Sequence, residues 1–209
     1  MVWREVMTGM SEKAPQDPLD RFLDLSAAAL SALESPLARN VATAIRELPA
    51  ALGQWENRHL PAADHFTAVC AMASEATRPL VDAVAALEDR FQWRGGGDHG
   101  FGDRKRGDLA YVPFVGLTSL VVTDAITCGI FLLAPGAFYP NHSHAADEIY
   151  YVIAGQGEWQ KDSGDFVAYG PGSLIEMPSF TPHALSTGAT PVLILYAWIG
   201  DIGGEYRIL

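Results

Sequence analysis

Residues 136–155 decide the fold, and they read Gly136-Ala-Phe-Tyr-Pro-Asn-His142-Ser-His144-Ala-Ala-Asp-Glu148-Ile-Tyr150-Tyr-Val-Ile-Ala-Gly155. Because successive side chains of a strand point to opposite faces, His142 and His144 share one face, and Glu148 and Tyr150 also share one. A tight bend at residues 145–147 would bring the two pairs together. The stretch therefore predicts imidazoles and a carboxylate gathered between two short strands.

A later segment supplies a fourth candidate ligand for a metal ion. His183 ends the run Met-Pro-Ser-Phe-Thr-Pro-His, on another predicted strand. A single histidine on a strand is usually a surface or packing residue, but this combination of three histidines and a glutamate rarely arises by chance. Imidazole and carboxylate ligands suit Fe, Mn, Co, Ni or Zn. We therefore expect one divalent transition metal, of open identity, on His142, His144, Glu148 and His183.

The chain from residue 109 to 209 is predicted to be mainly β. Short runs rich in Val, Ile, Leu, Tyr and Phe are bounded by Gly, Pro, Asp and Ser, as in LAYVPFV (109–115) and VLILYAWIG (192–200). Many short strands with regular turns are typical of an antiparallel sandwich or barrel.

Residues 1–93 are predicted to form a helical extension that packs on the β part. Asp17-Pro18 and Ser35-Pro36 each combine a capping residue with a first-turn proline, which predicts two helix starts. A third helical region is expected from Pro61 to Arg90, kinked or split at Pro79. The Gly-rich, charged segment 94–108 is expected to be a connector, either a mobile loop or a lid.

Composition narrows the class of protein. The formal net charge of −11 disfavours nucleic acid or an anionic membrane surface as the main partner. The first residues lack the apolar core of a signal peptide, and no apolar run approaches the ~18 residues of a membrane span. Cys70 and Cys128 lie in apolar stretches, as expected for buried thiols in a reducing compartment. We expect a cytoplasmic protein.

Residues 136–155 resemble the first sequence motif of the cupin family, in which Gly, five residues, H-x-H, three residues, Glu, six residues and Gly follow in this order. The second motif is matched in part, by Gly172, Pro178 and His183. It departs from the pattern at Phe180 and Thr187, where cupins often carry Gly and Asn, and neither departure removes a ligand. The resemblance covers about 110–200 and implies a double-stranded β-helix barrel with the metal inside.

The flanking residues narrow the resemblance to the cupin-type dimethylsulfoniopropionate lyases of bacteria. That family has a helical N-terminal part, a metal held by histidines and glutamate, and an active-site tyrosine in an E-x-Y motif, which Tyr150 matches here. A tyrosine ahead of H-x-H and a tryptophan near the C-terminus also line its pocket, and Tyr139 and Trp198 match these. Tyr196 shares a strand face with Trp198.

The resemblance implies a lyase that cleaves zwitterionic dimethylsulfoniopropionate to dimethyl sulfide and acrylate by β-elimination. Free tyrosine has a pKa of ~10, and a neighbouring divalent cation lowers it. Tyr150 is therefore the hypothesised base. Tyr139, Tyr196 and Trp198 are the expected substrate-binding residues, with a cation–π contact to the sulfonium as the expected role of Trp198 and Tyr139.

Two other functions stay open at this point. The same ligands would serve a small-molecule dioxygenase that uses Fe(II) and O₂, and oxygen consumption would discriminate it. A non-enzymatic ligand-binding or regulatory cupin is the second alternative, although such proteins often lack the ligands. The oligomeric state is also open, with a homodimer as one option.

Overall fold

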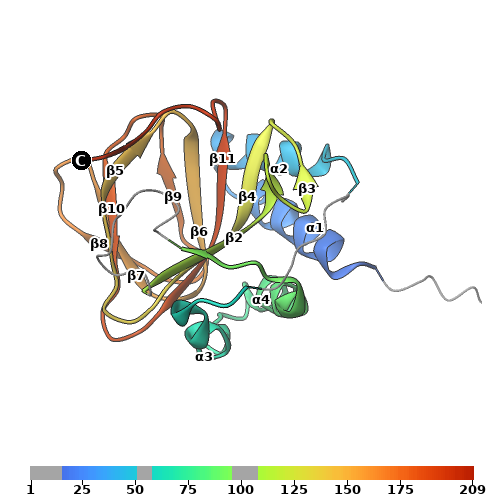
Figure 1. Ribbon diagram of the computed structural model, residues 1–209, viewed down its shortest axis with the longest axis horizontal. Coiled ribbons are helices and arrows are strands. Elements are labelled where there is room, and N and C mark those ends of the chain that lie inside the picture. Colours follow the sequence, from blue (N-terminus) through green and yellow to red (C-terminus); the bar gives the residue numbers. More distant parts are fainter. Residues whose placement is uncertain (1–15, 51–57, 96–107) are drawn as a thin grey trace, which may run out of the picture.

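A computed structural model describes residues 16–50, 58–95 and 108–209, and two β-sheets form its centre (Figure 1). The first sheet has the strand order β1-β2-β4-β11-β6-β9, with β3 beside β2. Its strands are β1 (Arg94–Gly95), β2 (Leu109–Gly116), β3 (Val121–Val122), β4 (Ile126–Leu133), β6 (Asp147–Gly155), β9 (Leu174–Met177) and β11 (Val192–Ile199).

The second sheet has the order β12-β5-β10-β7-β8. Its strands are β5 (Phe138–His144), β7 (Gly157–Lys161), β8 (Val167–Tyr169), β10 (His183–Ser186) and β12 (Tyr206–Ile208). The two sheets face each other, as the predicted antiparallel sandwich or barrel requires, and among the pairs of described strands only β2–β3 is parallel.

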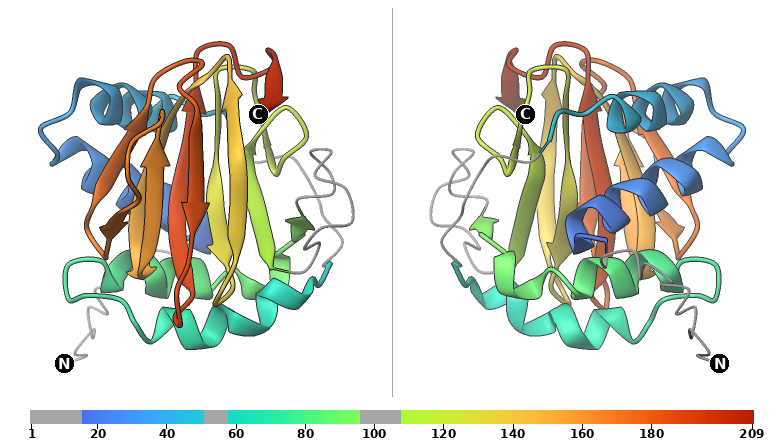
Figure 2. Two further views of the ribbon diagram at one scale, coloured as in Figure 1. Left: turned by 90° about the vertical axis from the view of Figure 1, so that its left-hand side faces the viewer. Right: turned by 90° about the vertical axis from the view of Figure 1, so that its right-hand side faces the viewer.

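Helices cover the outer face of the first sheet (Figure 2). They are α1 (Pro18–Ser31), α2 (Pro36–Arg46), α3 (Phe66–Cys70) and α4 (Arg78–Ala85), with the 3₁₀ turns η1 (Pro61–His65) and η2 (Glu88–Arg90). The side chains of Asp17 and Ser35 accept hydrogen bonds from the backbone N–H groups of Leu19 and Ala38, so each caps the helix that its sequence predicts.

The predicted third helical region is split, as expected, but the break lies between Cys70 and Arg78, ahead of Pro79. Pro79 lies in the first turn of α4. Before it, the hydroxyls of Ser74 and Thr77 each accept a hydrogen bond from the other residue's backbone N–H, at 3.3 and 3.1 Å. Such local bonds offer the backbone an alternative to the helix, and they end it between α3 and α4.

Alternation along each strand divides the buried residues between two cores. On β11, Leu193, Leu195 and Ala197 pack toward the helices, whereas Ile194 and Tyr196 face the space between the sheets. One sheet thus builds a helix-covered core on one face and the lining of the barrel on the other.

The interface between the helices and the barrel includes Phe22 of α1 and Phe114 of β2, both fully buried, with ring centroids 5.3 Å apart. Phe22→Ala is expected to lower the free energy of unfolding by about 3–5 kcal/mol, because it leaves a cavity under α1. Urea denaturation measures the loss. The control Phe138→Ala, at a side chain that is 49% exposed, should change it by less than about 0.5 kcal/mol. Equal losses would contradict the packing account.

Only the two ends of the connector 94–108 belong to the described residues. The expected connector 94–108 begins as strand β1, in which Arg94 pairs with Tyr111 and Gly95 with Ala110. Residues 96–107, on which the lid hypothesis rests, lie outside the described residues. Among the helices that are described, none combines the length and the apolar character needed to cross a lipid bilayer.

Candidate metal centre

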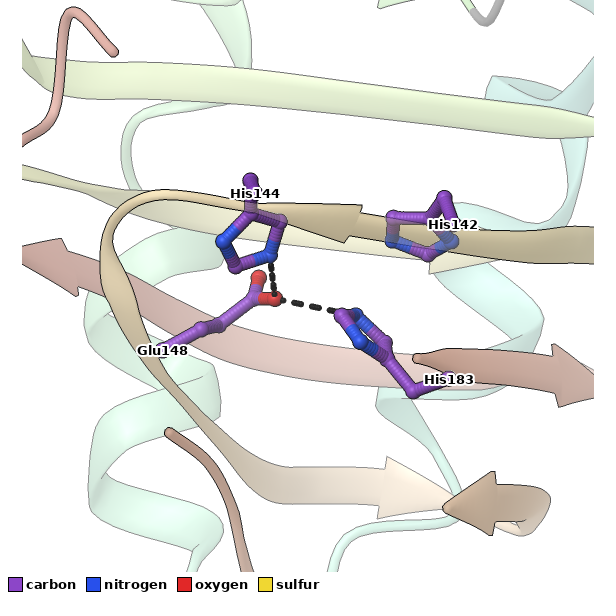
Figure 3. Close-up of side chains that lie close together, drawn as sticks. All are labelled: His142, His144, Glu148 and His183. Atoms are coloured by element: carbon purple, nitrogen blue, oxygen red, sulfur yellow. Dashed lines mark hydrogen bonds and ion pairs between the residues drawn. The ribbon is translucent and has the colours of Figure 1, made fainter. Parts of the chain in front are cut away.

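Three strands bring the four predicted ligands together inside the barrel (Figure 3). His142 and His144 lie on β5, and Glu148 lies near the start of β6. Residues 145–146 form the predicted tight bend between these two strands. His183 opens β10, where it pairs in register with His142.

Backbone carbonyls fix the orientation of all three imidazoles. Nδ1 of each histidine lies 2.8–2.9 Å from a carbonyl oxygen two residues away, which is that of Pro140 for His142, Ala146 for His144 and Thr181 for His183. A carbonyl only accepts, so each Nδ1 carries a proton and donates it. The other ring nitrogen, Nε2, is the atom left to bind a metal. In known metal sites, too, the non-ligating ring nitrogen donates a hydrogen bond that fixes the tautomer of the histidine.

The ligand atoms converge on one buried point. One potential ligand atom from each of the four residues lies within 4.8 Å of the other three, and every residue is buried. Oε2 of Glu148 lies 2.8 Å from Nε2 of His144 and 3.3 Å from Nε2 of His183. Metal bonds to such atoms are about 2.0–2.2 Å long, so two ligands of one ion lie at most about 4.4 Å apart, and small side-chain shifts would let a single ion contact all four. The residues therefore fit a transition metal such as the cupin motif implies.

The charge distribution around these atoms also suits a cation. Burial alone would raise the pKa of Glu148, but the ion pair with His144 holds it below its usual range. The same pair raises the pKa of His144 against the effect of its own burial. Burial and the neighbouring His183 lower the pKa of His142 to about 3. The site thus combines a buried anion with neutral imidazole, and a bound metal would replace the proton of His144.

A cavity of about 170 Å³ opens beside the cluster and is lined by both His142 and Glu148. Tyr150 lines it, two residues after Glu148. The hydroxyl of Tyr150 lies 3.2 Å from Nε2 of His183, at the edge of the ligand cluster. A small molecule in this cavity would contact the ligand cluster and the phenol together.

The other predicted substrate-binding residues line the same cavity: Tyr139, Tyr196 and Trp198. In the β11–β6 register, Tyr196 lies opposite Tyr150 and Trp198 opposite Glu148, so the predicted shared face is observed. The Trp198 ring packs on His144, with centroids 4.3 Å apart. Its indole N–H is buried and has no hydrogen-bond partner within the described chain.

Sequence reasoning missed several residues around the cavity. Tyr111 and Phe131 line it and stack on each other, and Arg94 is a basic residue of the lining. Tyr206 contacts Tyr139 from β12. Tyr111 and Phe131 lie on strands buried on nearly every residue, where hydrophobic alternation does not reveal which face lines a cavity.

Comparison with known proteins agrees with this geometry. The sequence model of a family described as dimethylsulfoniopropionate lyase matches residues 35–194, which include the four candidate ligands and Tyr150. The chain belongs to the dimethylsulfoniopropionate lyase family. Dimethylsulfoniopropionate lyase DddQ of Ruegeria pomeroyi is 34% identical over 80 residues, or 38% of this chain. The chain spans about two fifths of the length of the curated relatives it matches.

Structural comparison covers more of the molecule. The crystal structure of the lyase DddQ from R. pomeroyi matches 92% of this chain and 97% of its own, with a TM-score of 0.77 and 25% identity. The match takes in the helical part as well as the barrel. It confirms the prediction of a cupin barrel with an N-terminal helical extension.

Proposed function

We propose that this protein is a dimethylsulfoniopropionate lyase, which eliminates dimethyl sulfide from its substrate and releases acrylate. The observation that carries the proposal is the position of the Tyr150 hydroxyl, 3.2 Å from His183 Nε2 at the wall of a small cavity. A potential base and a metal site therefore border one space that a small molecule can fill. Family membership and the likeness to DddQ support the choice of substrate.

Tyr150 is the proposed base. Burial, the charge on Glu148 and the neighbouring Tyr139 by themselves raise the pKa of Tyr150 well above 10. A divalent cation held by His142, His144, Glu148 and His183 would counter this by favouring the tyrosinate and would act as a Lewis acid toward the substrate carboxylate. Of the candidate metals Fe, Mn, Co, Ni and Zn, the ligand types favour none.

The proposed reaction is a β-elimination in which Tyr150 takes up the proton. The Tyr150 phenolate removes a proton from the carbon beside the substrate carboxylate. The electrons of that C–H bond form the new double bond, and the electrons of the C–S bond leave with sulfur as dimethyl sulfide. Tyr150 ends as a phenol and passes its proton to solvent before the next cycle. Burial of the site limits competing contact of the base with water.

The cavity wall suits a small zwitterion. Aromatic rings of Tyr196 and Trp198 can lie against a sulfonium, a contact worth ~0.5–2 kcal/mol. The buried indole N–H of Trp198 and the guanidinium of Arg94 are donors suited to a carboxylate. Arg94 also donates to the hydroxyl of Thr118 at 3.0 Å. This contact places its guanidinium at the part of the cavity wall formed by the loop between β2 and β3.

We further propose that residues 1–93 cover the barrel residues 109–209 rather than act as a separate domain in this cytoplasmic enzyme. The Ser35 hydroxyl donates to the Glu176 carboxylate, and Phe22 packs on Phe114. Cys70 and Cys128 are free thiols, in keeping with a reducing compartment.

Headspace dimethyl sulfide from the metal-reconstituted protein supplied with dimethylsulfoniopropionate tests the proposal. We expect gas release that exceeds the protein-free control, together with one acrylate per dimethyl sulfide. Absence of release after reconstitution with each of Fe, Mn, Co, Ni and Zn would reject the lyase assignment. Oxygen uptake without release of dimethyl sulfide would instead favour a dioxygenase.

A further inference from the structure

The last strand of the chain completes the wall beside the metal ligands. β12 pairs with β5, and the register places Tyr206 opposite His144 and Ile208 opposite His142. Backbone hydrogen bonds of 2.9 Å, from Ala145 to Glu205 and from Leu209 to Asn141, hold the strand at both ends. The family match ends at residue 194, so this strand lies beyond it.

Tyr206 contacts the centre in two ways. Its hydroxyl oxygen lies 3.1 Å from that of Tyr139. Its ring lies nearly parallel to the imidazoles of His142 and His144, at interplanar angles of 28° and 16° and centroid distances of 5.5 and 6.3 Å. Tyr139 lines the cavity, and its ring centroid lies 4.2 Å from that of His142. Tyr206 is not part of the cavity lining. Any effect of the Tyr206 hydroxyl on a ligand in the cavity must therefore pass through its neighbours.

The paired hydroxyls restrict each other. A phenol has one proton to donate, so only one of the two hydroxyls is the donor in the 3.1 Å contact between them. When Tyr206 donates to Tyr139, the Tyr139 proton is directed away from Tyr206. The bond also polarises Tyr139, which makes it a stronger donor to a further acceptor.

We propose that Tyr206 is a positioning residue: its hydroxyl orients the hydroxyl of Tyr139 to donate to a carboxylate bound in the cavity. The inference rests on the proposed function for its substrate, since the carboxylate is the hydrogen-bond acceptor of dimethylsulfoniopropionate. It assigns Tyr206 to substrate affinity rather than to the proton transfer at Tyr150.

A double-mutant cycle of Tyr139→Phe and Tyr206→Phe tests this role. Phenylalanine keeps both rings, so the stacking on the imidazoles stays and metal content should equal that of the wild type. Tyr206→Phe is expected to raise KM about fivefold, the effect of one hydrogen bond, with kcat within about twofold. In the Tyr139→Phe background, the same change should have no further effect. Equal multiplicative effects in both backgrounds, or an unchanged KM in Tyr206→Phe, would overturn the inference.

Binding of propionate, measured by calorimetry on the metal-loaded proteins, separates this inference from the proposed function. We expect Tyr206→Phe to weaken propionate binding about fivefold, again only when Tyr139 is present. A wild type that binds propionate in this pattern but releases no dimethyl sulfide would reject the lyase assignment and keep the role of Tyr206. Equal propionate affinities in wild type and Tyr206→Phe, or no binding to the wild type, would reject the role of Tyr206.

Discussion

Tyr150→Phe is expected to lower the rate of dimethyl sulfide release by about 10²–10⁴-fold while the protein keeps its fold and its metal. General acid–base groups contribute rate factors of this size, and the substitution removes only the hydroxyl near His183. The ring packs against Trp159, with centroids 5.9 Å apart, and phenylalanine preserves that contact. Gas chromatography of the headspace measures the rate, and elemental analysis measures the metal.

The adjacent tyrosine supplies a matched control. Tyr151 follows Tyr150 on β6 but belongs to the helix-covered core on the opposite face of the sheet. Tyr151→Phe should therefore release dimethyl sulfide at nearly the rate of the wild type. A metal-loaded Tyr150→Phe protein with full turnover would show that another group removes the proton.

His144→Ala is expected to lower metal affinity by at least about 100-fold and to abolish dimethyl sulfide release. Loss of an outer partner of a ligand already costs about 10–100-fold, and the change removes a ligand outright. It also leaves the buried carboxylate of Glu148 without its 2.8 Å partner. Competition with a chromogenic chelator measures the affinity of each protein.

A surface histidine separates this effect from a general change in charge. His59 is exposed and pairs with Asp64 at 3.1 Å, outside the barrel. His59→Ala should bind metal and turn over substrate as the wild type does. Wild-type metal affinity in His144→Ala would remove His144 from the ligand set.

The candidate centre was predictable from sequence because its parts are local. His142, His144 and Glu148 lie within seven residues, and strand alternation with one tight bend brings them together. His183 belongs to another strand and was included for its residue type. Its pairing with His142 depends on a sheet register that strand periodicity alone does not specify.

Other parts of the site depend on contacts that local patterns do not encode. Tyr206 lies on a strand of three residues, too short to show alternation, and its partner Tyr139 is 67 positions away. The same holds for the helical region from residue 61, where side-chain bonds of Ser74 and Thr77 override its helical periodicity.

The carbonyl groups that orient the three imidazoles belong to the main chain, and no side-chain substitution can delete them. The coordination geometry is therefore separable from the residues that shape the cavity, such as Tyr111 and Phe131. Randomising those wall positions should yield libraries in which most members still load metal. The barrel is accordingly a practical starting point for directed evolution toward other small carboxylates, with the ligand strands held constant.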